Sequence, residues 1–264
     1  MRAIIIAAGR GSRLEHHTDT TPKGMVEING GSILSFQLGA FEQNGVDDLH
    51  IIRGYLSDKL VVPGATYYEN EVWEQNNILH SLFCAEDAFT GPLLTTYSDI
   101  VYTPEVVEKL LATDLDIALV VDADWAKTYV GRDDHPVEQA ELCEVDASGV
   151  RITQVGKWVG PEATIGEFIG LAYYSSEGAK QLLEIWRDLR ANLTDDEPFQ
   201  HAELFRKAYL ADLFNEAIAR GVNIGFVQIE GGWREIDTVQ DYHLATNHYR
   251  HSIYKLETQV YHFH

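Results

Sequence analysis

The sequence predicts an α/β fold, in which a mostly parallel mixed sheet is flanked by helices and carries an inserted region of β-hairpin and helices. Three observations predict it. Apolar runs of strand length alternate with amphipathic helical stretches up to Asp122, an order typical of parallel sheets covered on both faces. After Asp122 a hairpin pattern interrupts this alternation. The composition, with 45% hydrophobic and 23% charged residues, is that of a globular chain rather than a disordered one.

The strands expected in the first half are short runs of apolar or small residues, and they cover residues 3–8, 49–52, 66–68, 93–96 and 117–121. Helices are expected between them at 33–44, at 78–88 and from Thr103-Pro104 onward. Ser32 is placed to cap the first helix and Gly45 to end it. Thr103-Pro104 has the preferred order of a cap followed by proline.

The second half begins with a hairpin, in which residues 142–145 and 151–155 flank the turn Asp146-Ala147-Ser148-Gly149. A strand at 168–174, two long helices at 177–192 and 201–220, and a strand at 224–228 follow. The end is helical, with a tail rich in His and Tyr. Because no linker or repeat interrupts the pattern, we expect one domain over 1–264, with a first half (1–122), an inserted region (123–222) and a return strand and helix (223–264).

The formal net charge is −21, from 20 Lys and Arg against 41 Asp and Glu. This excess of acid argues against a nucleic acid or an anionic membrane as partner. Only two cysteines, no apolar stretch of membrane-spanning length and no leader pattern lead us to expect a cytoplasmic protein. For the His- and Tyr-rich tail we expect no more than fraying or a contact in a homodimer.

A glycine-rich segment with the sequence Gly-Arg-Gly-Ser-Arg-Leu (9–14) follows the first predicted strand, and Pro22-Lys23 comes shortly after it. Glycines let backbone N–H groups approach a phosphate closely, and Arg13 and Lys23 add two cations. A dinucleotide-binding loop requires glycine where Leu14 stands and an acid where Arg53 stands. A Walker A loop requires Gly-Lys-Ser/Thr, which is absent. The segment therefore predicts a phosphate loop of another kind, with a flexible solvated turn as the alternative.

This segment and Pro22-Lys23 together resemble the first motif of the nucleotidyltransferases that make nucleotide sugars and CDP-activated phosphates, Gly-x-Gly-Ser/Thr-Arg-Leu/Met followed by Pro-Lys. The resemblance implies a Rossmann-like fold and a nucleoside triphosphate whose phosphates lie over the glycine loop. It also implies catalytic roles for Lys23, at the α-phosphate, and for Arg13. The nucleotide-binding residues expected around this loop are Ala8, Gly9, Gly11, Ser12 and Ser98.

Acidic residues follow two of the predicted strands, Asp99 after 93–96 and Asp237 after 224–228. Because the ligand crevice of an open parallel sheet lies at the carboxyl ends of its strands, both acids are expected to face substrate. Two such carboxylates can share a Mg²⁺ with triphosphate oxygens, and the family resemblance implies the same role. The alternative is that they are turn or capping residues, with Asp237 capping a helix that starts near Val239.

The segment Asn-Asn-Ile-Leu-His-Ser-Leu (76–82) stands where sugar-1-phosphate members of the family carry Pro-x-Gly-Leu-Ala. It resembles instead the small cytidylyltransferases that act on phosphocholine and on phosphonates. Asn76, Asn77 and Ser81 offer donors and acceptors for a pyrimidine edge, so CTP is the expected nucleotide. An N-cap at Asn76 and a packed Ser81 are the structural alternative.

The acceptor side is predicted from residues that also resemble the phosphocholine and phosphonate branch. Arg132 is expected to form a bidentate bond to the acceptor phosphate, with His135 nearby and Lys157 as a second cation. Glu167 and Trp233 suit an aliphatic ammonium by charge and by cation–π contact. The charges are equally compatible with a solvated surface, and the indole with core or lid packing.

These residues lead us to expect a Mg²⁺-dependent cytidylyltransferase that transfers CMP from CTP to a small phosphonate, such as 2-aminoethylphosphonate, or to a phosphocholine-like phosphomonoester. A sugar-1-phosphate nucleotidyltransferase is the alternative enzyme, disfavoured by the missing Gly-Leu-Ala. A sugar-nucleotide-dependent glycosyltransferase would not need the loop with Arg13 and Lys23. A nucleotide sensor without catalysis is the remaining alternative, and pyrophosphate release would distinguish it from any transferase.

Overall fold

A computed structural model describes residues 1–252 of the chain, with side chains up to residue 246. The His- and Tyr-rich tail singled out in the sequence lies outside the described residues. The strands and α-helices occur in the following order: β1 (Arg2–Ala7), β2 (Glu27–Ile28), β3 (Gly31–Ser32), α1 (Ile33–Gln43), β4 (Asp48–Arg53), β5 (Thr66–Glu69), α2 (Ile78–Leu82), β6 (Leu93–Tyr97), β7 (Ile100–Tyr102), α3 (Pro104–Leu111), β8 (Ile117–Asp122), β9 (Leu142–Val145), β10 (Ile152–Gly156), β11 (Thr164–Tyr174), α4 (Ser176–Asn192), α5 (Leu210–Ala219), β12 (Gly225–Ile229), β13 (Trp233–Glu235) and α6 (Val239–Ser252).

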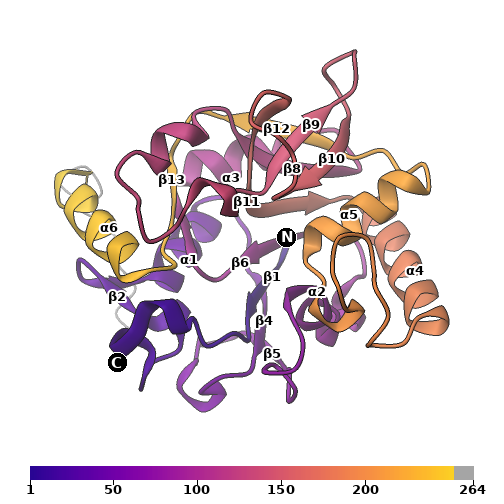
Figure 1. Ribbon diagram of the computed structural model, residues 1–264. Coiled ribbons are helices and arrows are strands. Elements are labelled where there is room, and N and C mark those ends of the chain that lie inside the picture. Colours follow the sequence, from indigo (N-terminus) through magenta and orange to yellow (C-terminus); the bar gives the residue numbers. More distant parts are fainter. Residues whose placement is uncertain (253–264) are drawn as a thin grey trace.

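The predicted mixed sheet flanked by helices is confirmed (Figure 1). β6, β1, β4 and β5 lie side by side and run parallel, which places their carboxyl ends at one edge. β11 is antiparallel to both β6 and β8, and β12 continues the sheet parallel to β8. The predicted hairpin is formed by β9 and β10, and β9 pairs with the first residues of β11. The inserted hairpin therefore stands beside the carboxyl end of β8.

Alternating side chains of β1 supply the two faces of the sheet. Ile4 and Ile6 pack with α2, α4 and α5, whereas Ala3 and Ile5 pack with α1 and α3. All four residues are at most 5% exposed, so the strand is buried on both faces, as its uninterrupted apolar sequence predicts. None of the helices among the described residues is both long and apolar enough to cross a membrane.

The helix boundaries follow the expected caps in the first half. The Oγ of Ser32 accepts a hydrogen bond from the N–H of Ser35, and α3 starts at Pro104. The helix expected at 78–88 is shorter as an α-helix, because the backbone of Ala85 leaves helical geometry and residues 83–88 form a 3-10 helix.

The helix expected at 201–220 is wrong in its first half, since α5 begins at Leu210. The carboxylate of Asp212 accepts hydrogen bonds from the N–H groups of His201 and Tyr209 and so caps the helix at this point. Phe205, which is fully buried, holds the preceding residues in turns against the core. Burial of this ring overrides the helical periodicity.

A second small sheet, formed by β7 and β13, joins two distant parts of the chain. The N–H of Ile236 donates to the carbonyl of Asp99 at 2.7 Å. This bond ties the turn after β6 to the segment after β13. It is the backbone reason why Asp99 and Asp237 meet at the same edge of the large sheet.

Candidate active site

The glycine loop leaves β1 at the edge where the parallel strands end. Gly11 has a φ of +67°, and a Cβ there would lie 2.6 Å from Cδ of Lys23. Glycine is therefore required for both the turn and the close passage of the lysine chain. Together with Arg13, Lys23, Asp99 and Asp237, all the residues predicted to bind nucleotide line one cavity of about 300 Å³, the glycine-loop cavity: Ala8, Gly9, Gly11, Ser12, Asn76, Asn77, Ser81 and Ser98.

The polar wall of the glycine-loop cavity is organised by Asn70, which is 1% exposed. Its amide nitrogen donates to Oδ1 of Asn76 and to Oγ of Ser81, each at 2.8 Å. The side chain of Asn77 donates to the carbonyl of Lys207. No cap bond is formed by the Asn77 side chain at the start of α2. The side chains of Asn70, Asn76 and Ser81 are thus fixed by one another, whereas that of Asn77 is fixed by the backbone of Lys207.

Lys23 lies between the two aspartates predicted to hold a metal. Its Nζ is 2.8 Å from Oδ2 of Asp99 and 2.6 Å from Oδ1 of Asp237. Burial opposes the charge on Lys23, but the two carboxylates outweigh it and raise the pKa of the ammonium. Burial likewise opposes the charge on Asp237, and the bonds from Lys23 and His135 with the charge of Arg13 hold its pKa well below the ordinary range. Lys23 and Asp237 are therefore both ionised at neutral pH.

Arg13 reaches the same carboxylate from the solvent side. Its guanidinium forms an ion pair with Oδ2 of Asp237, while its own side chain is 53% exposed. It lines both the glycine-loop cavity and the neighbouring one. An exposed, permanently charged group at the junction of two cavities is well placed to contact an anion that passes between them.

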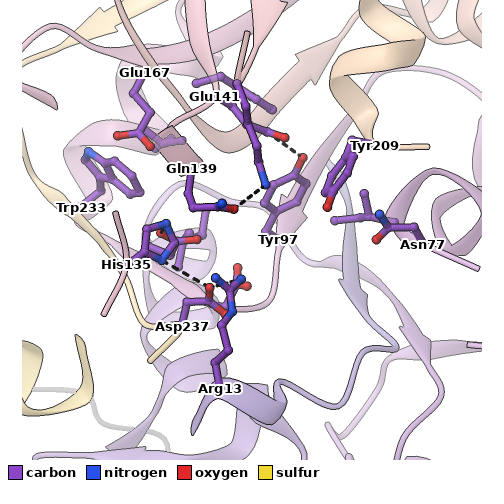
Figure 2. Close-up of a pocket in the computed structure, with 17 residues that line it drawn as sticks. Arg13, Asn77, Tyr97, His135, Gln139, Glu141, Glu167, Tyr209, Trp233 and Asp237 are labelled. Atoms are coloured by element: carbon purple, nitrogen blue, oxygen red, sulfur yellow. Dashed lines mark hydrogen bonds and ion pairs between the residues drawn. The ribbon is translucent and has the colours of Figure 1, made fainter. Parts of the chain in front are cut away.

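The neighbouring cavity, of about 340 Å³, is called here the acidic cavity because Glu141, Glu167 and Glu235 line it. Figure 2 shows Arg13 and Asp237 at one end and Glu167 and Trp233 toward the other, with His135 and Gln139 between them. The cavity therefore joins the charged cluster around Asp237 to a wall of acidic and aromatic side chains.

Two buried carboxyl groups of the acidic cavity are held by phenols. Oε1 of Glu167 accepts a hydrogen bond from Tyr129 at 2.6 Å, and Oε2 of Glu141 accepts one from Tyr97 at 3.3 Å. Burial raises the pKa of Glu167 to about 8, and that of Glu141 to about 7. Oε2 of Glu167 is buried and has no hydrogen-bond partner among the described residues. Such an oxygen is a site for a donor or a cation from a ligand.

Lys157 and His135, expected from the sequence on the acceptor side, both line the acidic cavity. Nζ of Lys157 donates to Oε1 of Gln139 at 3.0 Å and lies 4.7 Å from the ring centre of Tyr209. His135 is 3% exposed, and its two ring nitrogens each lie 3.4 Å from a carboxylate, that of Glu235 or that of Asp237. Both side chains can thus contact a ligand that enters the cavity.

Arg132 does not face the acidic cavity, which corrects the expectation that it binds the acceptor phosphate. Its side chain is 5% exposed, and its Nε donates to Asp241 at 2.5 Å while a terminal nitrogen donates to Glu235 at 2.8 Å. Asp241 in turn accepts hydrogen bonds from the N–H groups of Asp237 and Thr238. The guanidinium is already satisfied, and it acts on the site through Glu235 and, by way of Asp241, through the backbone of Asp237.

The same bonds decide how α6 begins. The N–H of Thr238 donates to Asp241, and the N–H of Asp241 donates back to Oγ1 of Thr238, a reciprocal cap of the helix. The capping function that the sequence left open for Asp237 is therefore filled by these neighbours. The carboxylate of Asp237 remains in the cavities.

The carboxylates of the site fit a divalent cation. Oδ1 of Asp99 is buried and has no hydrogen-bond partner among the described residues. It lies beside the oxygens of Asp99 and Asp237 that contact the ammonium of Lys23. Ligand atoms of His135, Glu235 and Asp237 lie within 4.8 Å of one another. Carboxylate oxygens are the donors that Mg²⁺ prefers.

Residues 3–213 match the family of MobA-like NTP transferase domains, a match that covers most of the chain. The chain belongs to this family. The resemblance to nucleotidyltransferases drawn from the glycine loop is thereby confirmed, and with it the expectation of an enzyme.

Among curated relatives, the chain is 30% identical to the CTP:phosphoglutamine cytidylyltransferase of Campylobacter jejuni, over 91% of this chain and 97% of that enzyme. It is 27% identical to the 2-aminoethylphosphonate cytidylyltransferase of Lancefieldella rimae, over 70% and 72% of the two chains. It is 28% identical to the choline-phosphate cytidylyltransferase of Streptococcus pneumoniae, over 67% and 79%.

Solved structures of two transferases that use CTP share the fold. The CTP:phosphocholine cytidylyltransferase from Streptococcus pneumoniae superposes with a TM-score of 0.69 at 18% identity, covering 94% of this chain and 98% of that one. The inositol-1-phosphate CTP transferase from T. maritima gives 0.70 at 18% identity, over 93% and 94%. The Rossmann-like fold expected from the resemblance is therefore confirmed.

Several residues of the site were not found from the sequence. Asn70 lies in a segment without a motif, and Asp241 lies within a helical pattern. Tyr129 was given no role, although it stands only three residues before Arg132. The only clue to Asn70 in the sequence was that it is a polar residue directly after a strand, β5. Asp122 offered a similar clue, as a polar residue at the end of β8.

Proposed function

We propose that the chain is a Mg²⁺-dependent cytidylyltransferase that transfers CMP from CTP to a small acceptor carrying a phosphate or phosphonate group and a cationic nitrogen. The observation that supports it best is the junction of the two cavities at Arg13, Asp99 and Asp237. One cavity has the glycine loop and the amide wall, and the other ends in buried carboxyls. A nucleotide and an acceptor can thus meet at the charged cluster.

The chemistry requires positioning and charge neutralisation rather than a general base. An acceptor oxygen that is already anionic attacks the α-phosphorus of CTP, a new P–O bond forms, and the bond to pyrophosphate breaks. Lys23 and Arg13 are the cations of this chain at the reacting group. Mg²⁺, held by Asp99 and Asp237, would neutralise charge on the triphosphate.

The acceptors named in the three relatives support the acceptor class. Phosphoglutamine, 2-aminoethylphosphonate and phosphocholine all combine a phosphorus oxyanion with a positively charged nitrogen. Glu167, with its unpartnered oxygen, and the indole of Trp233 provide charge and a π-face for such a nitrogen. The phosphorus end then lies toward Arg13, at the junction of the cavities.

Among these acceptors, phosphoglutamine is favoured by the extent of the match, since only that relative is matched over nearly its whole length among the three. It also carries a carboxylate, for which Lys157 is a cation within the same cavity. The phosphonate and phosphocholine expected from the sequence remain acceptors of the same class, distinguished by the absence of this carboxylate.

A screen for pyrophosphate release tests the proposal. Each of ATP, CTP, GTP and UTP is incubated with Mg²⁺ and with phosphoglutamine, 2-aminoethylphosphonate, phosphocholine or glucose-1-phosphate. Release is expected with CTP and at least one of the first three acceptors. Release with glucose-1-phosphate alone supports a sugar-1-phosphate nucleotidyltransferase instead, and no release in any pair refutes a transferase of either kind.

A further inference from the structure

Asp122 is a fully buried carboxylate behind the wall of the acidic cavity. It is the last residue of β8 and is 0% exposed. Its Oδ2 accepts a hydrogen bond from Nε1 of Trp233 at 2.8 Å, and its Oδ1 accepts from the N–H of Gly231 at 2.8 Å and of Asp124 at 3.0 Å. All three of these hydrogen bonds come from neutral N–H groups, so none of the donors neutralises the charge of the carboxylate.

The position of Asp122 in the sheet links it to the acceptor wall. In the pairing of β8 with β11 it lies opposite Glu167. The indole that it holds is 7% exposed and lines the acidic cavity. In Figure 2 the ring of Trp233 and the carboxylate of Glu167 lie on the same side of this cavity. Asp122 therefore stands behind the two groups proposed to receive the cationic nitrogen.

Asp122 also fixes the turn that brings the indole there. Gly231 and Gly232 both have positive φ, at +75° and +82°, and they connect β12 to β13. The carboxylate of Asp122 accepts one hydrogen bond from the backbone of this turn, at Gly231, and one from the side chain that follows the turn, that of Trp233. One carboxylate thus sets both where the ring lies and how it is rotated.

We propose that Asp122 is a positioning residue for acceptor recognition: it orients the indole of Trp233 and, through the hydrogen bond to its N–H, makes the ring face a stronger receptor for the acceptor's cationic nitrogen. An anion bonded to the indole N–H polarises the ring toward greater electron density, and cation–π attraction grows with that density. This inference rests on the proposed function for the identity of its ligand.

The test compares two acceptors of the same size, of which only one carries a cationic nitrogen. 2-Aminoethylphosphonate and propylphosphonate have the same number of non-hydrogen atoms, with NH₃⁺ in one where the other has CH₃. The amine preference is the ratio of kcat/KM for the first to kcat/KM for the second. In Asp122→Asn we expect this preference to fall about tenfold, as loss of an oriented cation–π contact implies, while the KM for CTP stays unchanged.

A double-mutant cycle shows whether Asp122 acts through the indole. Trp233→Phe removes the N–H donor and keeps an aromatic ring, and it is expected to lower the amine preference by itself. Adding Asp122→Asn to it should then have little further effect. Equal losses with and without Trp233 would mean that Asp122 attracts the cation directly, which overturns the proposal, as does an unchanged preference in either single variant.

The matched control is Asp116→Asn, which removes a carboxylate just before the opposite end of β8, where Oδ1 of Asp116 accepts a bond from Ser175. It should leave the amine preference unchanged. Should Asp122→Asn fail to fold, Trp233→Phe keeps the backbone bonds of Asp122, and an unchanged amine preference in that variant still overturns the proposal.

A measurement without turnover separates this inference from the proposed function. With ¹⁵N-labelled tryptophan, the indole resonance of Trp233, assigned by its loss in Trp233→Phe, is expected to shift on titration with 2-aminoethylphosphonate but not with propylphosphonate. No shift with either compound overturns the inference. Failure of the wild-type chain to release pyrophosphate, by contrast, counts against the proposed function alone.

Discussion

The ammonium of Lys23 lies 2.6 Å from Oδ1 of Asp237, although the two residues belong to opposite ends of the chain. The same nitrogen lies 2.8 Å from Asp99, so it occupies the point at which the two carboxylates meet. In the proposed function, a triphosphate and a metal ion would compete for the partners of this lysine. The ion pair would then be a resting arrangement of charges that the nucleotide rearranges.

Replacement of Lys23 by Ala is expected to lower kcat by about a hundredfold or more, since it removes a cation at the group where charge develops. The fold should remain intact, because Mg²⁺ can neutralise the carboxylates that lose their partner. Pyrophosphate release measures the first effect and circular dichroism the second. Lys180→Ala, on the exposed face of α4, is the control and should be unchanged. A near-wild-type rate for Lys23→Ala would remove the lysine from the mechanism.

Asp99→Asn is expected to raise the Mg²⁺ concentration required for half-maximal rate, because an amide is a weaker ligand for Mg²⁺ than a carboxylate. Titration of the rate with MgCl₂ at fixed CTP measures this, and EDTA should abolish turnover of the wild-type chain. Asp87→Asn, an exposed carboxylate outside the cavities, serves as control. Full activity in EDTA would exclude the proposed metal dependence.

The rate should increase with pH as the acidic cavity ionises. Burial raises the pKa of Glu141 to about 7 and of Glu167 to about 8, so below these values both groups are largely neutral and attract a cationic acceptor weakly. As pH rises through this window, kcat/KM for the acceptor should rise, with kcat/KM for CTP less affected. The profile of Glu167→Gln should lack the upper step. An identical profile in that variant would assign the step to the acceptor's own ionisation.

The parts of the site predicted from the sequence are those whose chemistry is local. The glycine loop, Lys23, Asp99 and Asp237 follow from residue types placed after predicted strands, and the structure brings them to one cluster. β13, which directly precedes Asp237, was not predicted. Arg132 was misread because its partners come from residues 103 and 109 positions later in the chain, and only the folded chain shows that they satisfy it.

The errors in the fold have a similar cause. Residues 201–209 have helical periodicity, yet burial of Phe205 and the cap formed by Asp212 hold them in turns. Local propensity competes with tertiary packing, and packing decides where a large ring can be buried. Asp122 was given no role for the same reason. Its role depends on the hydrogen bond that it accepts from Trp233, which lies far along the chain, after β12.

Arg132→Gln is expected to destabilise the fold by about 3–5 kcal/mol, because it leaves the buried carboxylate of Asp241, together with the half-buried carboxylate of Glu235, without their cation. Urea denaturation measures the free energy of unfolding. Arg187→Gln, which breaks an exposed pair with Glu86, should change it by less than about 1 kcal/mol. Equal effects of the two substitutions would show that the ion pairs of Arg132 contribute no more to the free energy of unfolding than an exposed pair does.

Glu167→Gln is expected to stabilise the fold at alkaline pH while weakening acceptor binding. The ordinary pKa of this carboxyl is 4.5 and burial raises it to about 8 in the folded chain. Between these values the folded state binds more protons than the unfolded state, so the wild-type chain loses stability as pH rises through this window. The uncharged amide has no such loss.

The free energy of unfolding, measured in urea at pH 6 and pH 9, should therefore fall less with pH in Glu167→Gln than in the wild-type chain. Glu138→Gln, an exposed site near the same cavity, should follow the wild type. In the same variant the acceptor KM should rise, because an amide cannot attract the cationic nitrogen by charge. If the variant is less stable than the wild type at pH 9, Glu167 stabilises the fold. Its burial would then be explained by stability and not by acceptor binding.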